Sequence, residues 1–332
     1  MELFKSSSKF SKKQIILLSI PVFFSNMAIP LVGMVDTGLM GNLSETKYLA
    51  ATSIASSMMT MIIWSFGFLR MGTVGVVAQA YGKSDYREIV KTLLRNFIIA
   101  LIVAFIIIIF TPLIKIAISH FFSPSVETEI LINNYLNIRV FSVPAELIIY
   151  IMIGFYLGIQ KTKISSLLVI ILSILNIVLS SIFVLTYDLK VTGVALGTLL
   201  ASHITMAIFL FYTYNYLIKK FKIIPRFENL FVKSKLLKLI NINFDIFVRT
   251  LFVTFAFLWV TYLGSKIGED YLAVNTILMQ FIILAAFFLD AYAFSTEGVV
   301  GFTIGRRSLK SFNTVVKNSI QISFITAVSY TH

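Results

Sequence analysis

Long apolar runs, separated by short polar connections, dominate the whole chain. A helix that crosses a bilayer needs about 20 mostly apolar residues. The runs are too long for the ~10-residue alternating strands of a membrane barrel, and backbone groups in lipid must be satisfied within such elements. We therefore predict an all-α polytopic membrane protein with about nine spanning helices. Their expected ranges are 14–38, 48–72, 90–114, 132–158, 164–186, 192–217, 244–264, 271–293 and 312–330.

Basic residues are distributed unevenly over the connections between these runs. Lys and Arg favour the cytoplasmic side of short loops. With the N-terminus in the cytoplasm, the outer connections hold only Lys47, Lys115, Lys190 and Lys266. The N-terminal segment and the inner connections hold 22 basic residues. The pattern predicts a multi-pass membrane protein with a cytoplasmic N-terminus.

Composition narrows the function classes further. Only 13% of the 332 residues are charged and mean hydropathy is +0.91, against about 25% charged residues in soluble domains. The net charge of +13 does not indicate a nucleic-acid partner, because the basic residues are sorted by loop. Cysteine is absent and only three histidines occur, so we expect no metal site and no cofactor. No Walker loop or nucleophile–base motif indicates an enzyme, and no cleavable signal peptide is recognisable.

An internal repeat appears at an offset of 223 residues. Positions 41–82 share ten identities with 264–305, without a gap. They include the tripeptides at 48–50 and 75–77, and the glycine at 82 that matches Gly305. Six spans separate equivalent points, so both copies have one orientation, as in parallel transporter repeats.

The repeat also predicts how the chain is organised. We expect a six-helix N-terminal bundle at 1–217, a cytoplasmic linker at 218–243, and a partial C-terminal bundle at 244–332. The linker is basic and amphipathic, which fits a helix lying on the membrane surface or a simple solvated loop. A complete second copy would reach about residue 440, so we expect a twelve-helix protein that this chain covers only in part.

Several motifs resemble one transporter family. The likeness is carried in the first half by the stretch Pro30–Gly41 (PLVGMVDTGLMG) and the segments 66–73 and 78–82. In the second half it is carried by the segments 244–250 and 289–294 and by Glu297. They are similar to the multidrug and toxic compound extrusion (MATE) family, in particular its DinF-like branch. The resemblance implies two six-helix bundles and export of organic cations or other amphipathic compounds, driven by H⁺ or Na⁺ entry.

Asp36 is the principal candidate for coupling. An ionisable group in a span is costly and therefore a functional candidate, and a low-dielectric cavity lets a carboxyl group load and release a proton nearer neutral pH. In the resembling family an aspartate at this motif position couples proton movement to bending of the first helix, and Pro21 matches its kink proline, a candidate hinge. Alternatively, Asp36 simply ends the helix at the surface.

The fifth span departs from the family pattern. The pattern Asn-x-x-x-Asp falls on Asn176 and Ser180, one helical turn apart; Thr198 matches a third polar position. Serine cannot carry a proton in this pH range. We expect coupling to depend on Asp36 alone, with these three residues as a polar network. The alternative is that the hydroxyls only satisfy helix backbone.

Other intramembrane residues are secondary candidates. Arg139 and Glu146 share a helix face and either form a structural ion pair or line the cavity. The remaining candidates are a charge network in the second bundle and a set of methionine or aromatic residues that suit a cavity for apolar cations. The network comprises Arg249, Asp290 and Glu297; the cavity candidates are Met34, Met61, Trp64 and Phe68.

The function that these observations favour is a cation-coupled antiporter, driven by protons, that works by alternating access as a monomer and takes small amphipathic substrates. A flippase for lipid-linked oligosaccharides in the same superfamily is the alternative within transport. Such a flippase needs a more basic cavity. Apart from the residues at span ends that are counted with the inner connections, only Arg70 and Arg139 lie within spans. A non-functional fragment is the alternative outside transport.

Overall fold

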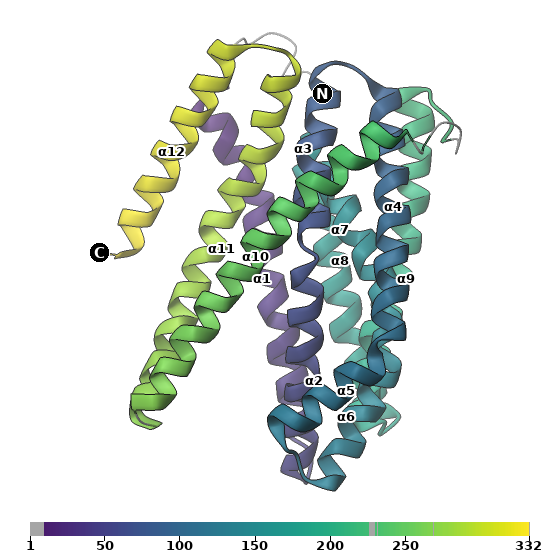
Figure 1. The fold of residues 1–332 in the computed structure, drawn as a ribbon, viewed down its shortest axis with the longest axis vertical. Coiled ribbons are helices and arrows are strands. Elements are labelled where there is room, and N and C mark those ends of the chain that lie inside the picture. Colours follow the sequence, from purple (N-terminus) through teal and green to yellow (C-terminus); the bar gives the residue numbers. More distant parts are fainter. Residues whose placement is uncertain (1–9, 226–229, 231, 268, 332) are drawn as a thin grey trace.

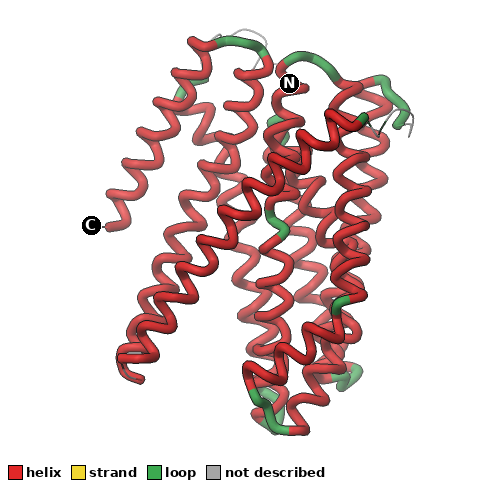
Figure 2. The backbone as a smooth tube through the Cα atoms, viewed as in Figure 1, coloured by secondary structure: helices red, strands yellow, loops and turns green. Residues whose placement is uncertain are grey.

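Helices joined by short loops make up the computed structural model, which describes residues 10–225, 230, 232–267 and 269–331 (Figures 1 and 2). Within that part of the chain no strand occurs. The α-helices are α1 (Lys12–Gly41), α2 (Thr46–Ser65), α3 (Phe68–Gly82), α4 (Tyr86–Ile109), α5 (Thr111–Phe122), α6 (Val126–Arg139), α7 (Val143–Gly158), α8 (Thr162–Ser181), α9 (Lys190–Tyr216), α10 (Lys233–Ile267), α11 (Glu269–Gly305) and α12 (Leu309–Thr331).

Six helical segments among the described residues are long and apolar enough to cross a membrane. They run over 12–41, 46–82, 86–109, 126–158, 162–186 and 190–221, which coincide with the first six predicted spans. Helices α10, α11 and α12 occupy the regions where the last three spans are expected. The all-α fold and its order along the chain are confirmed.

The first helix begins at a reciprocal cap. The Ser11 hydroxyl accepts a hydrogen bond from the Gln14 backbone amide, and the Gln14 side chain accepts one from the Ser11 amide. This capping box satisfies two backbone donors that have no helical partner. The helix then runs unbroken to Gly41, although Pro21 and Pro30 lie inside it.

Three of the predicted spans contain a backbone break. The second span divides at residues 66–67 into α2 and α3. The third ends at Ile109, and the short helix α5 begins at Thr111 with Pro112 in its first turn. The fourth has a 3-10 turn at Val140–Ser142 between α6 and α7. Pro144 follows that turn directly and lacks the amide hydrogen that a continuous helix would need there. The breaks turn side chains of one span toward different neighbours.

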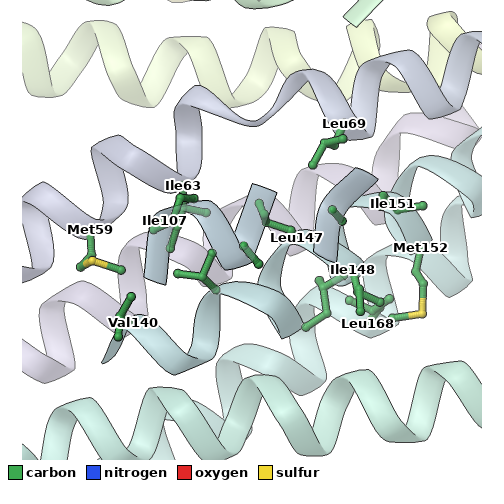
Figure 3. Close-up of a cluster of buried hydrophobic side chains, with 14 of the residues drawn as sticks. Met59, Ile63, Leu69, Ile107, Val140, Leu147, Ile148, Ile151, Met152 and Leu168 are labelled. Carbon is green, nitrogen blue, oxygen red and sulfur yellow. The ribbon is translucent and has the colours of Figure 1, made fainter. Parts of the chain in front are cut away.

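The N-terminal bundle encloses the main apolar core, with α7 at its centre. Side chains on α7 pack against residues of α2, α3, α4 and α8 (Figure 3). Leu147 and Ile151 of α7 are fully buried in this core. Most of α7 is therefore shielded from lipid, which fixes the orientation of its polar residues.

The second bundle joins the first mainly through α11, which packs along α3 and α1. The two helices α3 and α11 approach so closely that a Cβ built at Gly82 would overlap the Phe302 carbonyl oxygen. A Cβ at Gly305 would likewise overlap the Gln79 carbonyl oxygen, and one at Gly301 would lie 2.7 Å from the Ala78 Cβ. Gly82 and Gly305 are equivalent positions of the internal repeat, so the repeated helices pack against each other through the glycines that they share.

The region expected as a linker is mostly helical where it is described. Helix α9 continues through a π-helical turn to Phe221, and α10 begins at Lys233 without a break before its apolar part. Residues 226–229 and 231, which belong to the expected linker, lie outside the described residues. Arg95 of α4 donates through Nε to the carbonyl of Leu230, at 2.8 Å, so this part of the connection is attached to the N-terminal bundle.

Candidate functional site

A cavity of about 480 Å³ opens within the N-terminal bundle. Its walls come from α1, α2, α6, α7, α8 and α9. Polar residues from all six helices face it, among them Asp36, Thr52, Asn176 and Thr198. A concave site with a few converging polar groups is the usual form of a small-molecule site, and this one lies within membrane-spanning segments.

Asp36 lies in the C-terminal part of α1 and lines this cavity. Its Oδ1 atom is buried and has no hydrogen-bond partner among the described residues. The positive charge of Arg139 acts on it electrostatically. The position is five residues before the end of the helix, so Asp36 does not act as its C-cap, which is Asn42.

The structure brings the three expected network residues together. Asn176 Nδ2 donates to the Thr198 hydroxyl at 3.1 Å, and the Ser180 hydroxyl donates to Asn176 Oδ1 at 3.2 Å. Thr198 in turn donates to the Val194 carbonyl. Asn176 and Thr198 line the cavity, whereas Ser180 is fully buried against Gly197 where α8 meets α9. Ser180 therefore holds Asn176 in place from behind the cavity wall.

Helix α2 supplies a wall of hydroxyl groups that the sequence interpretation missed. Thr52, Ser53, Ser56, Ser57 and Thr60 all line the cavity. They recur at the i, i+4, i+8 spacing of one helix face, so a helical projection of this segment could have identified them. The wall offers hydrogen bonds to a bound molecule without adding charge.

Arg139 and Glu146 form an ion pair with each other, and both also line the cavity. The two arrangements expected as alternatives therefore occur together. Arg139 Nη2 donates to Glu146 Oε2 at 3.2 Å, and Nη1 donates to Glu146 Oε1 and to the Ser142 hydroxyl. The pair bridges the turn between α6 and α7. Tyr135 and Tyr150, one turn from each member, also line the cavity.

Of the four soft and aromatic candidates, the structure places only Trp64 on the main cavity. Met61 lines a second hollow of about 310 Å³ beside it, which Trp64 shares. Met34 is 68% exposed on the outside of α1. Phe68 packs on Phe66 and Phe247, with ring centroids 5.7 and 5.8 Å away.

The expected second-bundle charges lie on α10 and α11, with an unexpected partner from α3. Arg70 of α3 places its guanidinium carbon 3.5 Å from the ring centroid of Phe294. Asp290 and Glu297 lie one helical turn to either side of Phe294 on α11, and both interact electrostatically with Arg70. Arg249 is exposed on α10 and also acts on both carboxylates. The cluster therefore spans the contact between the bundles rather than lying within the second one.

Pro21 lies near the contact between α1 and the second bundle. The next residue, Val22, is buried with Val74, Leu157 and Ala291 in a small apolar cluster. Proline leaves the carbonyl four residues earlier without its helical hydrogen bond, so α1 has a weak point beside the surface on which the bundles meet.

Comparisons with known proteins agree with this architecture. The family model described as MatE matches residues 21–182. The DNA damage-inducible protein F of Escherichia coli K12 is 32% identical over 291 residues, which are 87% of this chain and 63% of that protein. The multidrug resistance protein NorM of Vibrio cholerae is 25% identical over 91% of this chain and 66% of its own length.

Solved structures give the same fold. A crystal structure of MATE in complex with MaD5 has a TM-score of 0.86 and 22% identity, over 96% of this chain and 72% of that one. The chain thus spans less than two thirds of these curated relatives and about seven tenths of that structure. Residues 21–182 thus match the MatE family model, and the chain is a homologue of DNA damage-inducible protein F with the fold of the MATE transporter structures.

Proposed function

We propose that the protein is a proton-coupled antiporter of the bacterial inner membrane that exports organic cations and other amphipathic compounds. The observation that carries the proposal is the Asp36 carboxyl in a membrane cavity, with one oxygen buried and unpartnered by any described residue. A proton and a cationic substrate would compete for that carboxylate, and such competition is sufficient for exchange. The relatives named for multidrug resistance support the substrate class.

Alternating access would follow from movement of the two bundles about the α3–α11 contact. Asp36 and Pro21 lie on one helix, and that helix packs against both α8 and α11. A change of charge at Asp36 would therefore reach the bundle contact through α1. With the N-terminus in the cytoplasm, the cavity would face the outer side of the membrane. One copy of the protein is sufficient for the transport cycle.

The flippase alternative is disfavoured by the state of the two arginines within spans. Arg139 is engaged by Glu146, and Arg70 is half-buried against Phe294 beside two carboxylates, outside the lining of the main cavity. A pyrophosphate group needs several exposed basic donors, and the described lining of the main cavity contains only Arg139, whose guanidinium is already bonded to Glu146.

The test is transport by the full-length protein in proteoliposomes with an imposed proton gradient. Asp36→Asn keeps the shape of the side chain but cannot exchange a proton, so we expect proton-driven efflux of a dye cation to fall to the level of empty liposomes. Asp188→Asn is the matched control, because Asp188 lies in the connection before α9 with φ 51°, a conformation that Asn also adopts. Efflux at the wild-type rate in Asp36→Asn would refute the proposal.

A further inference from the structure

Three residues with full formal charges line the main cavity. They are Asp36 on α1, Arg139 at the end of α6, and Glu146 in the first turn of α7. Tyr135 and Tyr150 are the other titratable groups on its wall. The described lining residues of α2, α8 and α9 are hydroxyl, amide, aromatic or apolar. The cavity therefore has a formal charge of −1 when Asp36 is ionised and zero when it is protonated.

The Arg139–Glu146 pair is built to stay ionised. Its two parallel hydrogen bonds have the bidentate geometry of a strong guanidinium–carboxylate contact, and the side chains are only 9% and 14% exposed. Removing one partner of such a buried pair leaves an uncompensated charge, which is strongly unfavourable. The pair contributes no net charge as long as it is intact, so Asp36 remains as the single uncompensated group.

We propose that the Arg139–Glu146 pair sets the valence of the transported species: the cavity accepts one positive charge at a time and selects monovalent over divalent organic cations. This inference rests on the function proposed above and specifies its substrate class. A second uncompensated charge within a membrane is disfavoured by about 100-fold. A dication would bring one such charge into the cavity, whereas a monocation or a proton would neutralise it.

Without Arg139 the same cavity would carry −2, and a dication would then be the neutralising ligand. Without Glu146 it would carry zero with Asp36 ionised, and cations of either valence would bind poorly. Removing both residues returns the charge to −1. The double variant thus separates charge from structure, because it restores the cavity charge while it destroys the bridge across the α6–α7 turn.

The experiment compares Arg139→Gln, Glu146→Gln and the double variant in the full-length protein. Tetraphenylphosphonium is the monocation and methyl viologen the dication. Equilibrium dialysis of the purified protein gives their affinities, and proteoliposome efflux gives their transport rates. We expect the affinity ratio to shift at least about tenfold toward the dication in Arg139→Gln. Glu146→Gln should weaken both cations by a similar factor, and the double variant should return to the wild-type ratio.

A purely structural role for the pair gives a different result. All three variants would then lose affinity for both cations, and the ratio of the two affinities would stay constant. The double variant would bind the cations no more tightly than the single variants. That result would overturn the inference. If a single variant fails to fold, the exchanged pair Arg139→Glu with Glu146→Arg keeps the charge at −1 and should keep the monocation preference.

Failure of the proposed function would look different again. A wild-type protein that binds both cations but does not exchange them for protons would contradict antiport, while its affinity ratio would still test the valence rule. A wild-type protein without preference for the monocation would contradict the valence rule, whether or not it transports.

Discussion

The substitution Gly82→Ala, which adds one methyl group, tests whether close contact between α3 and α11 holds the two bundles together. A Cβ built there overlaps the Phe302 carbonyl oxygen and lies 3.0 Å from the Gly305 Cα and 3.1 Å from the Arg306 nitrogen. All three are backbone atoms, so none can rotate away. Gly75, two turns earlier on the same helix, has no atom within 4 Å of its Cβ position and provides the matched control.

The magnitude follows from two opposing effects. Alanine is favoured over glycine in a helix by about 1 kcal/mol, and Gly75→Ala should gain up to that amount. Overpacking costs about 1–3 kcal/mol. Since backbone must move at Gly82, we take the upper half of that range, which leaves Gly82→Ala about 1–2 kcal/mol less stable than wild type. The two variants should therefore differ by about 2–3 kcal/mol.

Thermal unfolding of the purified full-length protein in detergent, followed by circular dichroism, measures this difference. At about 2 °C per kcal/mol, the midpoint of Gly75→Ala should exceed that of Gly82→Ala by roughly 5 °C. Midpoints that rise equally in both variants would show that the helices do not meet at Gly82, and the account of the bundle contact would be wrong.

Three further outcomes follow from single contacts. Asn176→Leu removes two side-chain hydrogen bonds and should lower the stability by about 1–3 kcal/mol. Ser180→Ala removes one hydrogen bond and should lower the stability less. Thermal unfolding midpoints compare the two variants, and equal decreases would contradict the larger role of Asn176. Phe294→Leu removes the ring beneath the half-buried guanidinium of Arg70 and should cost about 1–2 kcal/mol. The same unfolding measurement tests it, and an unchanged midpoint would refute that contact. At Glu45, a hydrogen bond and ion pair with the lysine at the start of α2 lower the carboxyl pKa below 4.5. The stabilisation is therefore present above that value and disappears as pH falls through the lower folded-state pKa, so wild type and Glu45→Gln should differ in midpoint at pH 7 and converge at strongly acidic pH.

The order of the apolar helices and the approximate positions of the first six spans could be predicted, because lipid imposes them. A window of about 20 apolar residues is a direct physical requirement of a span. The breaks at 66–67 and 140–142 were not predicted, because averaging over such a window removes a local change of backbone direction. Gly67 and Pro144 are the residues that could have indicated them.

The candidate site was predictable where its residues are close in sequence. Arg139 and Glu146 are seven residues apart, and their common face survives the intervening turn. Asn176 and Ser180 are one turn apart and are joined by a hydrogen bond. The contact of Arg70 with Phe294 joins residues 224 positions apart. No spacing rule reports such a contact, because it depends on which faces of α3 and α11 meet.

Helix α1 connects the cavity to the contact between the bundles. Its C-terminal part carries Asp36 into the cavity, and its N-terminal half packs on α11, where Val22 is buried with Ala291 and Asn26 donates to the Phe287 carbonyl at 3.5 Å. Pro21 removes a backbone hydrogen bond beside this contact. Bending there would change how α1 meets α11 while leaving the cavity hydrogen bonds of α8 and α9 intact. A charge change at Asp36 and a movement of the second bundle can therefore share one helix without dismantling the polar network of α8 and α9.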